Sequence, residues 1–576
     1  AHESGWSPEH YSGIVANPPY IRLDSKPTSD DRLSIISDGC NDPFEPYREA
    51  LSKHCDTSDT WSKLTSTIGG RADISVIFWF LCILNLKPGH RLAIVTSDAW
   101  RSRNYGLIQR ALIELSLDLE LIIKQPKNLW FPETQVSTSL VVARKRGEGE
   151  VSEAKPVRVM HVSRKFNLAE ERGISDLCDE LELNSDCMVT RAIQVVDYMF
   201  KLEHSIPGLV DVFQTKRIDI SRSLVSDLSI SEGVGNEVLL SILPKVLSSA
   251  VDAHPPAELV SPFDKLHGSF EALSEHIKFR QGLRTGCDRA YYCSIRNIRD
   301  YATLSDKDDV VVTFTEPLDL EVRIPKRYVK RCVKGQNEDP AKSDTGVVIP
   351  GKSVTREDFR LMEKTYPEKI DAWKERGLHV MPNGLESWVS RVEATNFGSH
   401  LVPKMILDHV VQKSNRNRIG LGEKLPDDVS EGDFPSWWYT LNLQPRHVSP
   451  LYFPRINSSG GGNMYASRDP GNFVISANFT TLDVPEVIEP STIIKMIETE
   501  WLETHLEISC APMGGGALKI EKAHFQRLVI PQIDLTRRFD GAEEIDMLFA
   551  KSLGIDYMLY LAKLKRVKES FRNMRE

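Results

Sequence analysis

The sequence lacks several features that would place it in a common class of protein. Its 576 residues contain no apolar run long enough to cross a bilayer, so neither a transmembrane helix nor a membrane partner is expected. The nine cysteines are odd in number, and no two of them are spaced Cys-x-x-Cys. This pattern argues against a zinc site or a disulfide framework, and it favours reduced thiols in the cytoplasm with no bound metal.

The chain also lacks the excess of basic residues that many nucleic-acid-binding proteins carry. Its formal net charge is −9, although local patches decide binding more than the global sum does. Residues 323–334 contain six cations and no acid, and residues 413–418 contain three further cations. Each patch is either a solvated face or a contact surface for phosphates.

The composition and periodicity predict a globular chain of several parts. Apolar residues make up 41% of the chain and charged residues 27%, as in ordinary globular proteins. Over residues 1–145, short apolar runs alternate with stretches of helical spacing, which predicts a parallel sheet with helices on both faces in a first domain of residues 1–165. Residues 166–265 are predicted to be a helical connector, residues 266–540 a mixed α/β domain with many loops, and residues 541–576 a helical tail.

The stretch Gly-Ile-Val-Ala-Asn-Pro-Pro-Tyr, residues 13–20, is a short apolar run that ends in an amide, two prolines and an aromatic ring. The rings of Pro18 and Pro19 fix φ and hold Asn17 extended. Because neither proline donates a backbone hydrogen bond, a rigid turn here presents an amide oxygen, a carbonyl oxygen and the Tyr20 ring together. These groups suit an exocyclic amine on a planar ring. The alternative is a polyproline turn with a buried tyrosine.

Three pieces of the first 145 residues resemble one enzyme family in its own order. Ile-Val-Ala-Asn-Pro-Pro-Tyr (14–20) resembles motif IV of the amino-methyltransferases that use S-adenosylmethionine, above all the N6-adenine DNA methyltransferases. Residues 73–100 are similar to the family's motif V helix, its Lys-Pro-Gly-Gly turn and the following strand, with His90 in place of the second glycine. Residues 119–145 resemble the segment with a phenylalanine loop and a closing strand.

The later part of the chain resembles the target-recognition domain of the gamma class, as in type IIG and type I-like enzymes. The resemblance implies an incomplete Rossmann-like, doubly wound sheet in 1–165, carrying motifs IV to VIII, and a DNA target-recognition domain in 266–540. It further implies site-specific methylation of a flipped adenine in a restriction-modification or phage-defence system. The similar pieces are FRQGLRTGCDRAYY (279–292), VVIPG (347–351), WWYTLNLQP (437–445) and GGGALKIEKAHFQRLVIP (514–531).

Roles for individual residues are carried over from the family by position. Asn17 and the carbonyl of Pro18, stiffened by Pro19, would accept hydrogen bonds from the adenine amine, and Tyr20 would stack on the flipped base. Phe131 matches the loop phenylalanine that contacts the base from another side.

The same resemblance places Asn17, Asp73 and Phe78 beside S-adenosylmethionine. For Phe78 the alternative is a residue of the helix core. A direct methyl transfer aligned by the protein needs no covalent intermediate, so no cysteine nucleophile is expected.

The family's glycine-rich loop and acidic strand end, which grip the cofactor, do not precede Asn17 in this sequence. A sheet without those strands would leave a long apolar edge. The expectation is therefore a split enzyme, in which a second subunit carries the glycine-rich motif. A longer enzyme that continues before residue 1 would explain the same pattern.

Double-stranded DNA is the implied partner, and basic residues are the candidates for binding it. Three alternatives stay open: a non-catalytic DNA specificity subunit, transfer to cytosine N4, and transfer to protein. The candidate DNA-binding residues are Arg284, Lys326, Arg327, Lys330, Lys413, Arg416, Arg418 and Lys519.

Overall fold

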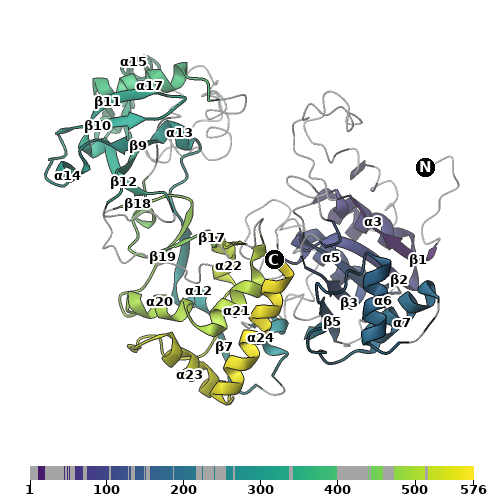
Figure 1. Ribbon diagram of the computed structural model, residues 1–576. Coiled ribbons are helices and arrows are strands. Elements are labelled where there is room, and N and C mark those ends of the chain that lie inside the picture. The colour runs from purple at the N-terminus through teal and green to yellow at the C-terminus, as the bar shows by residue number, and fades with distance from the viewer. Residues whose placement is uncertain are drawn as a thin grey trace. The chain divides into compact units, whose positions relative to one another are not determined.

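The computed structural model of the chain contains two compact units (Figure 1). The first comprises Ala1–His276, Ile456–Asn463 and Pro485–Glu576, and the second comprises Ile277–Arg455 and Met464–Val484. The residues that the structure describes are 11–19, 45, 48–49, 51, 59–68, 74–102, 106–126, 129–131, 137–147, 150, 156–183, 185, 187–215, 224, 239, 254–263, 266–335, 342–375, 377–397, 439, 441, 443–457, 473–512 and 517–575.

The first unit contains a six-stranded mixed sheet. Its strands are β1 (Tyr11–Ala16), β2 (Leu86–Ser97), β3 (Leu117–Lys124), β4 (Thr138–Lys145), β5 (Val157–Val162) and β6 (Val210–Thr215). Their order across the sheet is β1-β2-β4-β3-β5-β6. β1 is parallel to β2, and β3 is parallel to β5. β4 is antiparallel to both of its neighbours, and β6 is antiparallel to β5.

The prediction of a mixed α/β fold is confirmed, but the prediction of parallel pairing is wrong for β4. Strand β6 lies in the stretch predicted to be a helical connector, and it instead joins the sheet antiparallel to β5. Parallel neighbours need a crossover connection. Helices α2 (Asp59–Ser66) and α3 (Ser75–Asn85) connect β1 to β2, and α4 (Ala99–Ser102) and α5 (Leu107–Ser116) connect β2 to β3. The described residues between β3 and β4 contain no helix. The chain therefore turns back and inserts β4 antiparallel between β2 and β3.

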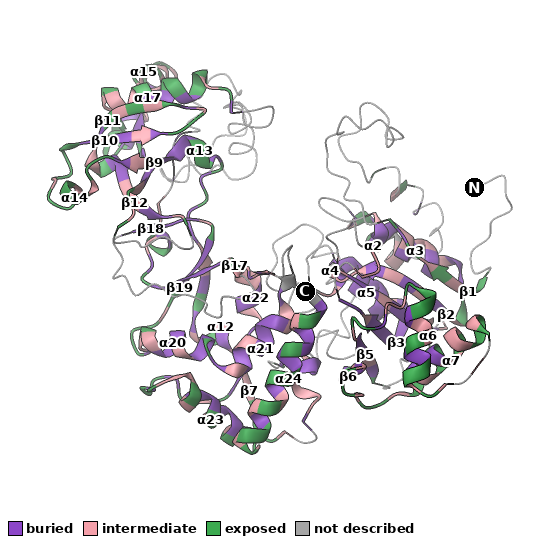
Figure 2. Cartoon of the chain, in the orientation of Figure 1, coloured by how far each residue is buried: buried purple, intermediate pink, exposed green. Residues whose placement is uncertain are grey.

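Helices cover both faces of this sheet, as the alternating pattern predicts. On one face, Trp79 of α3 and Leu112 of α5 belong to the same apolar cluster as Ile94 and Val141 of the sheet. The other face packs against α6 (Glu171–Glu180) and α7 (Met188–Lys201) through a second cluster. Figure 2 shows buried residues along these strands and exposed residues on α6 and α7.

Helix α3 forms because its sequence suits a fully buried helix. Nearly every residue is apolar and most are buried, which is the pattern of a helix surrounded by protein. The helix ends where the chain enters β2 at Leu86. Gly89, three residues further on, has a φ of +80°, a left-handed conformation that glycine adopts without a steric penalty.

The C-terminal helix packs back onto the first sheet. Helix α24 (Tyr557–Arg575) contributes Val567 and Phe571 to the apolar cluster of that sheet. It also pairs with α21 (Glu500–Ser509), where Lys568 forms ion pairs with Glu500 and Glu503 at 2.5 Å and 2.9 Å. The end of the chain is thus part of the core of the first unit.

The second unit has its own sheet and core. Its sheet has the order β11-β10-β9-β13-β12-β18. Trp388 of α17 is fully buried, contacts Tyr291 edge to face at 5.4 Å and donates from its indole N–H to the carbonyl of Ala290 at 2.8 Å. The elements are β9 (Tyr292–Ile295), β10 (Asp309–Phe314), β11 (Leu320–Pro325), β12 (Val329–Val333), β13 (Thr345–Val348), β18 (Val474–Ile475), α15 (Arg356–Thr365) and α17 (Asn383–Ala394).

The remaining strands are short, and the remaining helices range from one turn to the 11 residues of α23. The strands are β7 (Phe270–Ala272), β8 (Lys278–Gln281), β14 (Ser353–Val354), β15 (His379–Val380), β16 (Tyr452–Pro454), β17 (Ile456–Asn457), β19 (Phe479–Asp483), β20 (Ala511–Pro512), β21 (Leu518–Lys519) and β22 (Val529–Pro531). The helices are α11 (Ala257–Val260), α12 (Leu273–His276), α13 (Asp288–Tyr291), α14 (Ile298–Tyr301), α16 (Ile370–Glu375), α20 (Pro490–Ile497), α22 (Lys522–Gln526) and α23 (Ala542–Ser552). Within the part of the chain that the structure describes, no helix combines the length and apolar character needed to cross a membrane.

We expect Phe571→Ala to lower the free energy of unfolding of the first unit by about 3 kcal/mol, because it opens a cavity between α24 and the sheet. Val15→Ser is the control, since Val15 of β1 is 88% exposed and a surface change costs within about 0.5 kcal/mol. Urea denaturation of the two variants checks this. Equal midpoints would show that α24 does not stabilise the unit.

Candidate active site at the carboxyl edge of the sheet

The Asn-Pro-Pro turn follows β1 directly. Asn17 and Pro19 are exposed and Pro18 is buried, while Tyr20 lies outside the described residues. The parallel pairing of β1 with β2 extends to Ala16, so the turn begins at the carboxyl end of a parallel strand. In α/β sheets, that edge is where ligands bind.

A carboxylate at the same edge is held by two neighbouring strands. Asp98 follows β2, and its Oδ2 accepts a hydrogen bond from Ser137 Oγ at 2.8 Å and pairs with Lys124 Nζ at 3.0 Å. The backbone N–H of Asp98 donates to the carbonyl of Ser137 at 2.9 Å. Burial alone would raise the pKa of Asp98, but the Lys124 ammonium and these hydrogen bonds leave that pKa below its usual value. The ionised carboxylate therefore ties the end of β2 to the end of β3 and the start of β4.

One face of the sheet carries a row of polar side chains near this edge. The strand registers pair Thr96 with Ser139, Ser139 with Lys124, and Lys124 with His161. Strand alternation puts all four on the face that packs against α3 and α5. Thr96, Ser139 and His161 are buried, so this row lies inside the protein.

Helix α24 covers the row at His161. The imidazole Nδ1 lies 2.9 Å from Ser570 Oγ, and the ring packs edge to face on Phe571 at 4.6 Å. Lys124 Nζ lies 5.7 Å from the centre of the same Phe571 ring. Burial, together with the charges of Lys124 and Arg101, holds the pKa of His161 well below its usual value. The imidazole is therefore neutral at physiological pH.

A second buried ion pair connects α4 to α11. Arg101 donates a hydrogen bond to Glu258, whose side chain is 4% exposed. Burial would raise the pKa of Glu258, but Arg101 lowers it below the usual value. The Asp98–Lys124 pair and the Arg101–Glu258 pair thus each combine one negative and one positive charge. Pairing of this kind is the condition under which buried ions are stable.

Phe131 lies in a described segment, residues 129–131, that follows the carboxyl end of β3. Its side chain is half-buried. Because β1 and β3 run in the same direction in the sheet, Asn17 and Phe131 both follow strand ends at the same edge. The two predicted residues therefore both follow the carboxyl edge of the sheet in the chain.

Phe78 lies in the first turns of α3, near the end of β2. The neighbouring Trp79 donates from its indole N–H to Thr96 Oγ1 at 3.4 Å, which connects this part of the helix to the last residues of β2. Phe78 is half-buried, whereas Ile77 and Trp79 beside it are buried. The predicted cofactor residue Asp73 lies outside the described residues.

Sequence reasoning missed three charged or titratable residues at this edge. Asp98, Lys124 and His161 each stand at or just beyond the end of an apolar strand run, as Asn17 does. A polar or charged residue at the end of an apolar run was the sequence feature that could have identified them. Their contact with one another depends on strand order, which the sequence did not reveal.

The predicted DNA-binding residues are spread over both units. In the second unit Arg284 and Arg327 are exposed and Lys330 of β12 is half-buried. Lys326 is used structurally, since its Nζ donates to the carbonyl of Leu304 at 2.6 Å. Lys519 belongs to the first unit and pairs with Glu521 at 3.0 Å. The predicted Lys413, Arg416 and Arg418 lie outside the described residues.

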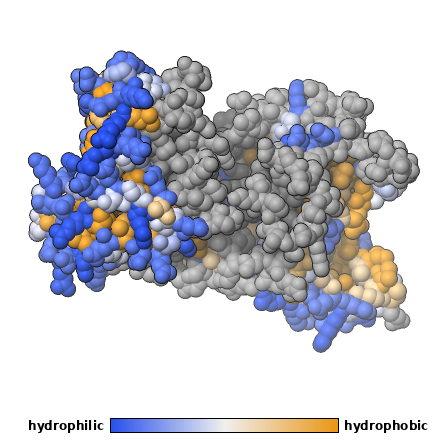
Figure 3. Space-filling view, turned by 90° about the horizontal axis from the view of Figure 1, so that it is seen from above, coloured by the Kyte–Doolittle hydropathy of each residue, from blue (hydrophilic) through white to orange (hydrophobic). Residues whose placement is uncertain are grey.

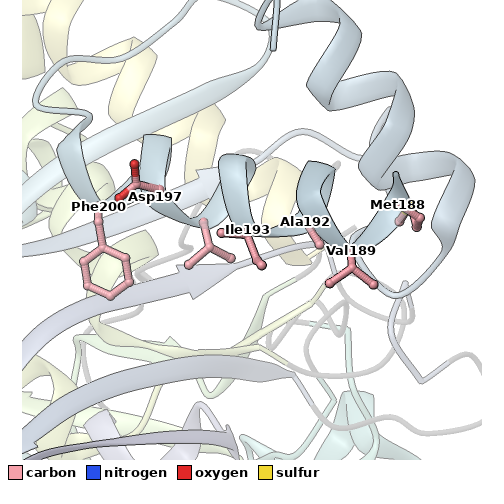
Figure 4. Close-up of a pocket in the computed structure, with 7 residues that line it drawn as sticks. Met188, Val189, Ala192, Ile193, Asp197 and Phe200 are labelled. Carbon is pink, nitrogen blue, oxygen red and sulfur yellow. The ribbon is translucent and has the colours of Figure 1, made fainter. Parts of the chain in front are cut away.

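A shallow apolar groove lies on α7 and has a volume of about 580 Å³ (Figure 4). Its lining contains none of the residues predicted for the site. Apolar surface also appears among hydrophilic side chains in Figure 3. The residues that line the groove are Met188, Val189, Ala192, Ile193, Val196, Asp197 and Phe200.

Comparison with known proteins gives remote likenesses. No protein-family model matches the chain, and no curated protein is significantly similar to it. Among solved structures, the type IIG restriction endonuclease BpuSI shows 13% identity and a TM-score of 0.29, with 98% of this chain and 54% of that one covered. The type IIL restriction-modification enzyme MmeI in complex with DNA shows 10% identity and a TM-score of 0.41, with 98% and 55% covered.

A methyltransferase subunit of a type I restriction-modification system from Streptococcus thermophilus shows 14% identity and a TM-score of 0.22, with 38% of this chain and 36% of that one covered. The chain spans about half the length of the two restriction enzymes. At these identities and TM-scores, the likenesses carry no argument about activity.

We expect the first unit to lose stability as the pH falls below about 6.5. The folded protein holds His161 neutral, whereas the unfolded chain binds a proton there, so acid favours unfolding. Urea midpoints at pH 7.5 and pH 5.5 should differ less in His161→Gln than in the wild type. His204→Gln, which alters an exposed histidine, should keep the wild-type difference. Identical pH dependence in all three proteins would contradict this assignment.

Proposed function

We propose that this chain carries the catalytic turn and the target-recognition part of a site-specific adenine-N6 DNA methyltransferase of a restriction-modification or phage-defence system. The observation that carries the proposal is the Asn-Pro-Pro turn at the carboxyl end of β1, a strand that pairs parallel with β2 in the mixed sheet of the first unit. That edge is where α/β sheets bind ligands.

The turn suits an exocyclic amine. Pro18 is buried and anchors the turn, whereas Asn17 is exposed. The Asn17 amide oxygen and the Pro18 carbonyl oxygen can each accept one N–H of the amine, which orients the nitrogen lone pair. Tyr20 and Phe131 would stack on the base from two sides, and such stacking offsets the cost of taking the base out of the duplex.

The described residues fit part of S-adenosylmethionine. A half-buried phenylalanine in the first turns of α3, Phe78, offers an aromatic face for the cofactor's adenine. When bound, S-adenosylmethionine supplies a methyl group whose bond to sulfur breaks as the nitrogen–carbon bond forms, with the electron pair left on sulfur and one proton lost from the amine. The chain's own contribution is to bind and align the amine, which is where most of the rate enhancement of such a step comes from.

The other part of the cofactor site would come from another polypeptide segment. No glycine-rich loop after a strand is found at the carboxyl edge among the described residues of the sheet. Within that described sheet β1 is one of the two edge strands, and it exposes 88% of Val15 and 42% of Tyr11. An exposed apolar edge strand is unfavourable in water. A second methyltransferase subunit, or a further segment of a longer chain, would cover it and bring the glycine-rich loop.

The second unit would bind double-stranded DNA. Its exposed Arg284 and Arg327 offer charge for phosphates or base edges. Residues 413–418, which carry Lys413, Arg416 and Arg418, add three cations in the sequence. Phosphate contacts of this kind would make the affinity fall steeply with salt.

We expect Asn17→Ala to reduce methyl transfer by at least about 100-fold, because the amine loses one of the two acceptors that align it. Tritiated methyl transfer to unmodified genomic DNA, followed by analysis of the labelled base, measures this. Gel-shift binding of DNA should be unchanged. Asn17→Asp keeps an oxygen acceptor and should retain more activity. Full activity in Asn17→Ala would refute the catalytic role, and label in cytosine would refute the choice of base.

We expect Val15→Asp to leave the urea midpoint of this chain alone unchanged, because the side chain is already exposed. In the complete enzyme the same change should weaken association with the segment that covers β1, and with it the binding of S-adenosylmethionine. Equilibrium binding of radiolabelled cofactor, with and without the second polypeptide, measures this. Wild-type cofactor binding by Val15→Asp in the complete enzyme would exclude β1 as the joining edge.

A further inference from the structure

The segment that carries Phe131 is held by one buried amide. Gln125 follows β3 and is 4% exposed. Its Oε1 accepts hydrogen bonds from the indole N–H of Trp130 and from the backbone N–H of Leu168, the latter at 3.0 Å. Its Nε2 donates to the carbonyl of Phe166. One side chain thus joins the 129–131 segment to the turn that follows β5.

That turn is rigidly supported. Phe166 is fully buried in the apolar cluster between the sheet and the α6–α7 pair. A side chain at Gly173 of α6 would place its Cβ 2.1 Å from the carbonyl oxygen of Asn167, so α6 presses directly against the turn. The turn to which the Gln125 amide is hydrogen-bonded is therefore part of the core.

A second, weaker contact acts in the same direction. Asn167 Nδ2 donates to the carbonyl of Leu129 at 3.4 Å and to Glu170 Oε1 at 2.8 Å. The N–H of Leu129 in turn donates to the carbonyl of Pro126 at 3.2 Å. Leu129 is thus bonded through its carbonyl to Asn167 and through its N–H to Pro126.

We propose that Gln125 is a positioning residue, which acts through Trp130 to hold Phe131 where it meets the target base. This inference rests on the proposed function. An aromatic ring stabilises an extruded base only if its own orientation is fixed beforehand, since ordering it on binding would cost conformational entropy. The buried amide supplies that order, because breaking it leaves polar groups without partners away from water.

Two variants and one matched control test the proposal in the complete enzyme. Gln125→Met keeps the length of the side chain and removes all three hydrogen bonds. Trp130→Phe removes only the indole donor and leaves the hydrogen bonds of Gln125 to residues 166 and 168. This variant therefore tests the proposal even if Gln125→Met folds poorly. Trp388→Phe is the control, because it makes the same change of side chain and removes an indole hydrogen bond in the core of the second unit.

Hydrogen exchange over residues 125–131 and steady-state methyl transfer to unmodified genomic DNA are the two readouts. We expect exchange of the Leu129 amide to rise at least about tenfold in Gln125→Met, to rise less in Trp130→Phe, and to stay unchanged in Trp388→Phe. In both site variants kcat should fall about tenfold or more, with the KM for S-adenosylmethionine within about twofold of the wild type. If Gln125 had a purely structural role, the variants would lower the free energy of unfolding but would not lower kcat at an unchanged KM.

Unchanged exchange in Gln125→Met would overturn the anchoring of the segment. Faster exchange with wild-type kcat would overturn its part in the reaction. A wild-type enzyme that transfers no methyl group would refute the proposed function and with it the base-facing role of Phe131, while the exchange result would still decide whether Gln125 anchors the segment.

Discussion

The parallel pairing of β1 with β2 is the contact on which the candidate site depends. It is a short pairing, in register from Gly13 to Ala16, yet it sets which edge of the sheet the Asn-Pro-Pro turn occupies and which side chains face the core. Ile14 and Ala16 pack against the apolar cluster under α3, whereas Val15 faces outward. A slip of one residue would exchange these faces and bury the wrong side chains. The burial of the inward-facing residues of β1 therefore fixes the position of the Asn-Pro-Pro turn.

The insertion of β4 gives the same edge its electrostatic character. Because β4 runs antiparallel between β2 and β3, its first residues meet the last residues of both neighbours. Asp98, Ser137 and Lys124 consequently form one hydrogen-bonded group. Had β4 been parallel, its opposite end would lie here, and Asp98 would have no partner from that strand. The buried charges are tolerable because each has an opposite charge within contact distance.

Two long-range attachments stabilise this arrangement from outside the sheet. Helix α24 reaches the polar row through Ser570 and Phe571, and α11 reaches α4 through Glu258. Helix α11 comes shortly before the residues of the second unit in the chain, and α24 comes after them. The first unit is therefore completed only when its C-terminal residues have joined it. The second unit has its own core around Trp388. The placement of its basic residues therefore does not depend on the docking of the C-terminal residues.

Local chemistry determined a good part of this protein from its sequence alone. The apolar runs of β2, β3 and β4, the buried helix α3 and the rigid Asn-Pro-Pro turn follow from periodicity and from the geometry of proline, which depend on neighbouring residues. Only the tertiary structure decided that β4 is antiparallel, that Lys124 meets Asp98, that Gln125 holds Trp130, and that His161 meets Ser570 across 409 positions of chain. Strand order and helix docking depend on the total apolar area buried and on the length of each connection. A short window of sequence contains neither quantity.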